Sequence, residues 1–189
     1  MSRLVTNAIR STAASSDAMT IDSAGKPSFP NGGVGKILQV VQTVKTDTTS
    51  YSNASSFADI SGMSITITPS STSNKILIIP DLALGGSDMA SYHLVWRLLR
   101  GSTAIAVSTS ATVAQLTGTG GMHRGASGAN AYFLGHSKMF LDSPSTTSAT
   151  TYKCQWSAYD NGATLYLNRR GSNAGVGGIS TITAMEVAA

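Results

Sequence analysis

Charged residues are scarce in this chain. Aspartate, glutamate, lysine and arginine make up 12% of its 189 residues, which is about half their share in an average soluble domain. Only one of the nine acids is a glutamate, Glu186. Because helical proteins normally cover their helices with glutamate and lysine, this scarcity argues against a helical protein. Serine and threonine outnumber the charged residues more than twofold, a composition typical of short strands joined by polar turns.

Cysteine and long apolar runs are also lacking. The single cysteine, Cys154, cannot form an intrachain disulfide, and its place in the segment Tyr152–Trp156 predicts a small buried side chain. No apolar run approaches the roughly 20 residues that cross a bilayer as a helix. The N-terminus has no apolar stretch of the signal-peptide kind. We therefore expect no membrane insertion, and assembly in a reducing cytosol.

The basic residues are scattered, although the net charge is +4. Only Arg169 and Arg170 are adjacent. Nucleic-acid-binding proteins gather their bases on one element, with aromatic residues between them. We expect no nucleic-acid partner.

Motifs that would indicate a catalyst or a cofactor are absent. The segment Gly32–Lys36 resembles the end of a phosphate-binding loop, but Pro30 stands where the loop needs its first glycine. Ile37 stands where it needs serine or threonine. No serine lies in a Gly-x-Ser-x-Gly elbow, and no pair of carboxylates suggests a glycosidase. We expect no enzyme activity and no cofactor; a carbohydrate-processing depolymerase is the enzymatic alternative.

Three histidines, His93, His123 and His136, lack the spacing of metal ligands. His93 and His136 are expected to be hydrogen-bonded strand residues, and no metal site is predicted. One alternative stays open, in which each of three chains contributes a histidine to an ion on a common axis.

Alternating apolar residues predict strands throughout residues 34–189. The expected strands are 37–44, 57–60, 63–68, 75–80, 92–99, 104–107, 131–141, 151–159, 164–168 and 180–187. The continuous apolar run at 76–79 predicts a central strand covered on both faces. Gly62 and the segment Asp160–Gly162 predict turns, the latter a hairpin. The predicted fold class is all-β: a jelly-roll-like antiparallel β-sandwich.

The hairpin Tyr92–Ile105 has two different faces. Its core face holds Tyr92, Leu94, Trp96 and Leu98. Its other face mixes bases with aliphatic residues and is the candidate subunit interface: His93, Val95, Arg97 and Leu99. Because an unpaired buried base is costly, Arg97 is expected to find a carboxylate or carbonyl on a neighbouring chain.

Two groups of residues are candidate contacts to a partner or receptor. The first lies in the glycine-rich segment 108–130 and comprises Met122, His123 and Arg124. The second is polar and aromatic, and it comprises Tyr159, Asn161, Tyr166, Arg169 and Arg170, with Asp160 and Asn168 among them. Such residues suit a sugar or a protein partner, and ordinary turn chemistry is the alternative for both groups.

Residues 1–33 contain too few apolar side chains to form a core. We expect an extended docking arm that another subunit or a larger assembly holds, followed by the sandwich domain 34–189. The candidate docking residues are Arg3, Leu4, Val5, Ile9, Arg10, Met19 and Ile21. The alternative is a segment folded back on its own domain.

Several segments, in their order along the chain, carry a resemblance. They are Ser15–Gly25, Gly35–Gln42, Ile65–Pro69, Asn74–Ile78, Arg97–Thr103, Leu165–Arg169 and Ser180–Glu186. Together they resemble small virion proteins of tailed phages, in particular tail-fibre-like and head-decoration proteins of aquatic phages.

The resemblance implies a homotrimeric β-sandwich head on the virion, assembled in the host cytoplasm, with the N-terminal arm as its attachment. It offers no catalytic motif. Implied partners are other virion proteins, of the tail, near the portal or of the major capsid, and a host surface glycan is a further candidate. Whether the protein belongs to the tail or decorates the capsid stays open.

Overall fold

A computed structural model of the chain describes most of its residues. The described ranges are 7–10, 15–29, 37–52, 56–87, 93–109, 117–123, 131–158, 164–171 and 175–189. The chain divides into two compact units, Met1–Leu38 and Gln39–Ala189.

The N-terminal unit contains a small antiparallel sheet. Its strands are β1 (Ala8–Ile9), β2 (Met19–Ile21) and β3 (Pro27–Ser28), in that order. Between β2 and β3, the Asp22 carboxylate accepts hydrogen bonds from the backbone N–H groups of Ala24 and Lys26, both at 2.9 Å. No described residue of this unit is buried, as the shortage of apolar side chains implied.

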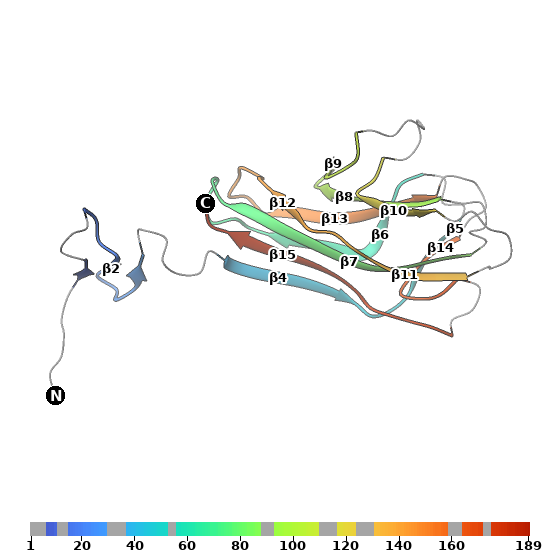
Figure 1. The fold of residues 1–189 in the computed structure, drawn as a ribbon, viewed down its shortest axis with the longest axis horizontal. Coiled ribbons are helices and arrows are strands. Elements are labelled where there is room, and N and C mark those ends of the chain that lie inside the picture. Colours follow the sequence, from blue (N-terminus) through green and yellow to red (C-terminus); the bar gives the residue numbers. More distant parts are fainter. Residues whose placement is uncertain are drawn as a thin grey trace. The chain divides into compact units, whose positions relative to one another are not determined.

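The second unit is a β-sandwich, and Figure 1 shows its two layers. The described residues form one seven-stranded sheet, comprising β4 (Ile37–Lys45), β5 (Thr49–Ser52), β7 (Lys75–Ser87), β11 (Ala131–Ser137), β12 (Phe140–Asp142), β14 (Thr164–Leu167) and β15 (Ser180–Val187). The five-stranded sheet comprises β6 (Ala58–Ile67), β8 (His93–Arg100), β9 (Thr103–Ile105), β10 (Gly120–His123) and β13 (Thr150–Ala158).

The strand order confirms the predicted fold class. The main paths run β4-β15-β7-β14-β5 and β10-β8-β13-β6. Every pairing between the strands that has a printed register is antiparallel, and the chain crosses repeatedly from one sheet to the other. This is the all-β, jelly-roll-like antiparallel sandwich expected from the sequence.

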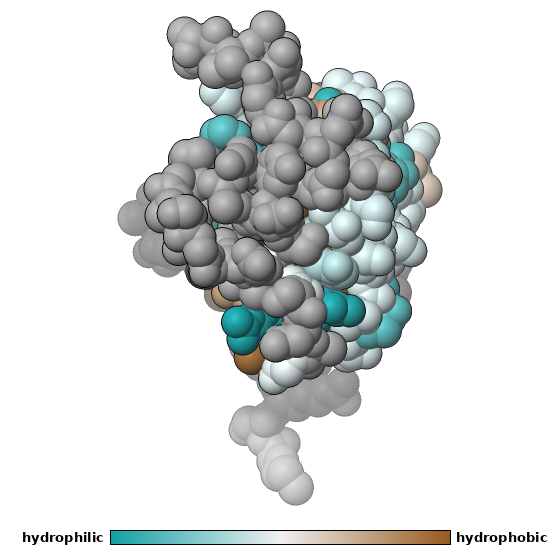
Figure 2. Space-filling model, turned by 90° about the vertical axis from the view of Figure 1, so that its right-hand side faces the viewer, coloured by the Kyte–Doolittle hydropathy of each residue, from teal (hydrophilic) through white to brown (hydrophobic). Residues whose placement is uncertain are grey.

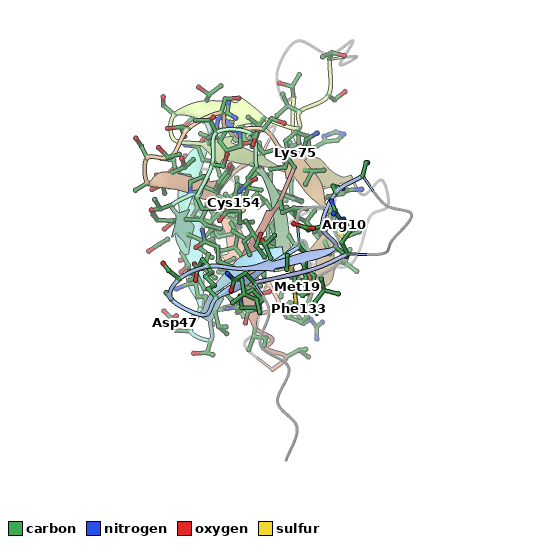
Figure 3. All side chains as sticks on the ribbon, turned by 90° about the vertical axis from the view of Figure 1, so that its left-hand side faces the viewer. Arg10, Met19, Asp47, Lys75, Phe133 and Cys154 are labelled. Carbon is green, nitrogen blue, oxygen red and sulfur yellow. The ribbon has the colours of Figure 1, made fainter. Side chains whose placement is uncertain are left out.

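The core lies between the two sheets and contains the predicted face of β8. Leu94, Trp96 and Leu98 are fully buried, and Tyr92 lies outside the described residues. Cys154 also points into the interior (Figure 3), with no exposed surface. Burial raises the pKa of its thiol to about 12, so the cysteine is a small apolar core residue, as predicted.

Three local predictions were wrong. Gly62 does not separate two strands; it lies within β6 with φ of +81°, where the register against β13 shifts. β7 continues through Pro80 to Ser87, and the break between β11 and β12 lies opposite Pro80, which has no N–H to donate. The segment 160–162 joins no hairpin, because β13 and β14 belong to different sheets.

Side chains of β4 close the edge of the sandwich beside β6. The Gln39 amide donates to the Thr68 carbonyl at 2.7 Å, and the Thr43 hydroxyl donates to the Ser64 carbonyl at 2.9 Å. An unpaired strand edge invites pairing with another chain. These two bonds occupy the carbonyls of Ser64 in β6 and of Thr68, the residue that follows this strand.

Candidate interaction surfaces

The outer face of the five-stranded sheet carries a closed polar network. Nε and Nη2 of Arg97 donate to Oε1 of Gln155 at 2.9 and 2.7 Å, and the guanidinium lies 3.8 Å from the centre of the Phe57 ring. Gln155 in turn donates to Asp59 at 2.7 Å, and Lys153 donates to the same carboxylate at 2.8 Å. These two hydrogen bonds, chiefly that of Lys153, hold the pKa of Asp59 below its usual value. The network satisfies its own charges.

This network changes the argument for the predicted subunit interface. Arg97 was expected to need an acceptor from a neighbouring chain, and the structure supplies Gln155 of the same chain. Leu99 is only 3% exposed, so it has little surface to offer a partner, while His93 and Val95 are half-buried. An interface at these residues stays a prediction, but Arg97 no longer requires it.

The outer face of the seven-stranded sheet is apolar. Met185 of β15, Leu77 of β7 and Leu141 of β12 lie in one row across three neighbouring strands. Contrary to the prediction that the 76–79 run is covered on both faces, Leu77 and Ile79 are only half-buried.

Two more strand positions extend this row. On β4, Gln39 bonds Glu186 and Gln42 bonds Thr183, which implies an antiparallel register with Val40 beside Met185. On the other edge, the N–H of Lys138 donates to the Pro80 carbonyl, so the register between β12 and β7 continues and places Met139 opposite Ile79.

We call this surface the apolar face. It comprises Val40, Leu77, Ile79, Met139, Leu141 and Met185, with the hydrogen-bonded polar pair Gln42 and Thr183 at the level of Ile79. Three of the apolar side chains are strongly exposed: Met139 at 73%, Val40 at 55% and Leu141 at 48%. Solvent-exposed aliphatic residues are common singly, but a contiguous group of this kind is a feature of interaction sites.

Two carboxylates of the same sheet, those of Glu186 and Asp142, point inward. Glu186 is 1% exposed and accepts hydrogen bonds from the Ser70 backbone and hydroxyl, the Asn74 amide and the Gln39 amide, all at 2.6–2.7 Å. Burial alone would raise the pKa of Glu186, but these hydrogen bonds outweigh it and lower the pKa to about 2. The only glutamate of the chain therefore anchors the β6–β7 turn to β15. No local sequence signal indicates this role, because its hydrogen-bond partners lie more than 100 residues away along the chain.

Asp142 forms the second buried anion. Both of its oxygens accept from Nη1 of Arg100 at 2.8 Å, and the Tyr152 hydroxyl donates to Oδ2 at 2.6 Å. Burial, with the carboxylate of Asp142 beside it, raises the pKa of Tyr152. The cluster joins β12 of one sheet to β8 and β13 of the other, so it clamps the sandwich together.

Asn168, predicted among the polar-aromatic contacts, is an interior residue. It is 1% exposed with φ of +62°, a left-handed conformation that asparagine tolerates better than most residues. Its amide donates to the carbonyls of Lys45 and Asp47 at 2.7 and 2.9 Å, and its Oδ1 accepts from Ser180 at 2.7 Å. No polar group of this side chain is left for a ligand.

Two other members of that predicted group do lie together. The Arg169 guanidinium is 4.4 Å from the centre of the Tyr166 ring, and its Nη2 donates to the Gly171 carbonyl at 3.0 Å. Arg170 is half-buried. Tyr159, Asp160 and Asn161 lie outside the described residues. Figure 2 shows the end of the sandwich where β5 and β14 lie, with mainly intermediate hydropathy among its described residues.

For the candidate contacts in the glycine-rich segment, the structure describes backbone positions only. Met122 and His123 lie in β10, where His123 is opposite His93 of β8, and Arg124 lies outside the described residues. Gly120 lies against the Trp96 indole, where an added Cβ would come within 2.8 Å of Nε1. This close approach requires glycine.

Of the docking residues predicted near the N-terminus, Ile9, Met19 and Ile21 lie in the small sheet. Ile9 pairs with Met19, Ile9 is 47% exposed, and Arg10 lies 3.7 Å from Asp17. Met19 and Arg10 are labelled in Figure 3. Ile21 is half-buried beside a hollow of about 430 Å³ formed by β2, β3 and their turn. Arg3, Leu4 and Val5 lie outside the described residues.

The part of the chain that the structure describes was expected to hold no metal site and no membrane-spanning helix. No three histidine, cysteine or acidic side chains lie close enough there to hold a metal ion, and no helix there is long and apolar enough to cross a membrane. His136 was expected to be hydrogen-bonded, but its Nε2 is buried without a partner. Burial, with a smaller contribution from Lys138, lowers the pKa of His136, so its imidazole is neutral at neutral pH.

Comparison with known proteins finds similarity among solved structures. No known family matches the sequence, and no curated protein matches it. Among solved structures, the chain is similar to the VP2 subviral particle of infectious bursal disease virus, with a TM-score of 0.37 and 14% sequence identity. The alignment covers 80% of this chain and 37% of the VP2 chain, so this chain spans well under half the length of VP2.

Proposed function

We propose that this chain is a non-enzymatic structural protein of a virus particle. It is a homotrimeric tail-fibre-like or receptor-binding component that attaches to the particle through its N-terminal unit. The observation that carries the proposal is the division of the chain into two units, of which only the second has a buried core among its described residues. The kind of particle is inferred from the resemblance of the sequence to small virion proteins of tailed phages.

The two units differ in what holds them together. The sandwich has its own buried core, whereas the N-terminal sheet has strands of two or three residues and no buried residue in its described part. A sheet this small is not stable alone in water. A unit of this kind gains its stability on another surface, which is the property that an attachment segment needs.

The chemistry of the sandwich supports a structural role. Its buried carboxylates, Glu186 and Asp142, are occupied by hydrogen bonds that join strands and sheets. On the outer polar network, Arg97 and Lys153 are paired within the chain. These polar groups stabilise the fold, and none of them is arranged toward a substrate.

A capsid decoration or cement protein, or a head fibre that clamps major capsid subunits, is the second candidate. The chain has a larger unit that contains the sandwich and a smaller N-terminal unit, a division that also suits decoration of a shell. The number of copies per particle separates the candidates. A decoration protein is present in proportion to the coat protein, and a tail component is present in a few copies.

Deletion of residues 2–30 tests the attachment. We expect the truncated chain to fold and to be missing from purified particles when their proteins are quantified by mass spectrometry. The full chain serves as the control for expression and copy number. Incorporation of the truncated chain at the full-length level would refute the attachment role.

The enzymatic alternative has its own test. The purified chain is incubated with polysaccharide from the host surface, and soluble oligosaccharides are measured over time. We expect none above the level of a heat-denatured sample. Steady release would contradict a non-enzymatic function.

A further inference from the structure

We propose that the apolar face of the seven-stranded sheet is the surface through which copies of this chain join. The inference rests on the proposed function only for the number of copies, three. It moves the joint from the outer face of β8, where the sequence had placed it, to the opposite side of the sandwich.

The size of the apolar face is the first argument. From β4 to β12 it crosses four strands, and it occupies two rows, at the levels of Leu77 and Ile79, that lie two residues apart along the strand direction. With strand spacings of about 4.8 Å and a rise of about 3.3 Å per residue, the backbone positions span roughly 15 by 7 Å before side chains extend the area. A contiguous exposed apolar area that polar residues border is a common feature of interaction sites.

The charges that border the face indicate what covers it. Lys75 and Asp81 are exposed on β7, on the same outward side as Leu77 and Ile79, about 20 Å apart. Neither side chain has an ion pair or hydrogen bond with the described residues. The other described carboxylates of the sandwich all have partners: Asp47, Asp59, Asp142 and Glu186.

A second copy of the chain fits this charge pattern. Each copy brings one unpaired lysine and one unpaired carboxylate at the borders of an apolar field, so contacts between copies neutralise both. A strongly acidic or strongly basic partner would leave one of the two charges next to a charge of its own sign. Such a juxtaposition costs binding energy.

The order of the chain supports the same occupant. β4, which forms one edge of the face, begins at Ile37, directly after the N-terminal segment. Copies that associate through β4 therefore start their N-terminal segments near one another. Each of these segments carries a sheet without a buried residue in its described part, and several together bury more surface than one.

The polar network on the opposite sheet is the less suitable joint. Covering it would remove water from Arg97, Asp59 and Lys153, which already satisfy one another within the chain. A partner there would gain few new bonds and would still desolvate these charges.

Mass measurement on surface variants tests the proposal. Light scattering of the full chain is expected to give three times 19.4 kDa. Val40→Asp and Leu141→Asp each place a charge on the apolar face and should weaken association roughly a hundredfold or more. Val176→Asp is the matched control, because Val176 is 47% exposed and lies outside the face; it should leave the trimer intact.

Three outcomes would overturn the inference. They are a monomeric wild-type chain, a trimer that survives both Val40→Asp and Leu141→Asp, and a trimer that dissociates with Arg97→Ala while the apolar-face variants remain assembled. A monomeric wild-type chain would mean that a different protein, such as a coat subunit, covers the apolar face. Near-ultraviolet circular dichroism, which reports the packing of the tryptophan side chains, checks that each variant is folded.

Methionine oxidation tests the wild-type protein without any variant that alters its fold. Met139 is 73% exposed in a single chain, and Met63 is fully buried in the core. If copies cover the apolar face, hydrogen peroxide should oxidise Met139 about tenfold more slowly in the assembled protein than in Val40→Asp, with Met63 slow in both. Equal, fast oxidation of Met139 in both proteins would overturn the inference.

The two proposals can fail separately. A trimer with a protected Met139 whose truncated form still enters particles would refute the attachment and keep the interface. If the truncated chain is missing from particles but the trimer is insensitive to the apolar-face variants, the interface is refuted and the attachment role is kept.

Discussion

The two sheets of the sandwich place their polar groups on opposite sides. The five-stranded sheet has an apolar inner face around Trp96 and an outer face that carries Arg97, Asp59 and Lys153. The seven-stranded sheet turns Glu186 and Asp142 inward, in one row with Ile76, and carries the apolar face on its outer side. The first sheet is built to face water. The second uses its charges to hold the fold together and leaves a surface suited to another protein.

The largest effect is expected when the inward charge of the seven-stranded sheet is removed. Asp142→Ala leaves Arg100 and the Tyr152 hydroxyl without their acceptor, and it should lower the free energy of unfolding by about 3 to 4 kcal/mol. Denaturant titration measures this loss. Tyr152→Phe keeps the ion pair and should cost about 1 kcal/mol. Equal losses in the two variants would contradict a clamp centred on Asp142.

Acid should act on the same sheet through Glu186. Its pKa is about 2 in the folded protein against an ordinary value of 4.5. Its ionised form therefore stabilises the fold fully above pH 4.5, and this contribution disappears as the pH falls from 4.5 toward 2. The contribution is up to about 3 kcal/mol.

The free energy of unfolding, measured between pH 6 and pH 2 for the wild type and for Glu186→Gln, tests whether the ionised Glu186 carboxylate stabilises the fold. The variant should be less stable at pH 6, and the difference between the two proteins should shrink as the pH falls. A constant difference across the range would show that the charge of Glu186 does not stabilise the fold.

An intermediate effect is expected from protein concentration, because the apolar face is proposed to join copies. For a trimer that unfolds to monomers, a tenfold rise in concentration stabilises each chain by about 1 kcal/mol. The thermal midpoint of the wild type should rise accordingly, while that of Val40→Asp should stay constant. A wild-type midpoint independent of concentration would remove the functional difference between the two outer faces.

The smallest effect is expected on the outer polar network. Asp59→Asn removes the ion pair with Lys153, which is solvent-accessible, and such pairs contribute at most about 0.5 to 1 kcal/mol. The loss should become smaller still in high salt, which screens exposed charges. Denaturant titration at low and high salt checks both statements. A loss as large as that of Asp142→Ala would mean that the two sheets do not differ as described.

Much of the fold could be predicted because its signals are local. The alternation of Leu94, Trp96 and Leu98 identified the core face of β8, and the phase of Cys154 identified a buried residue. The β8–β9 hairpin was also predicted, since its turn residues lie next to its strands. A side chain's burial follows from its neighbours along one strand when the period is two.

The candidate sites were predicted less well because their partners are distant in sequence. Gln155, which accepts from Arg97, lies 58 residues away, so the sequence suggested that another chain must supply an acceptor. Asn168 lies among turn-like residues, yet its bonds reach Lys45 and Ser180. The apolar face was missed because its residues come from four strands or the residues beside them, and each strand contributes only one or two of them.

The sequence by itself determined that the chain is all-β, because scarce charge, abundant hydroxyls and period-two apolar residues are properties of short segments. It also determined that the N-terminal segment lacks the material for a core. Only the tertiary structure decided which outer face is polar and which apolar, because that depends on which strands become neighbours. Pairing β4, β15, β7 and β12 in one sheet brings Val40, Met185, Leu77 and Leu141 into a single row, and no single strand contains enough of that row to reveal it.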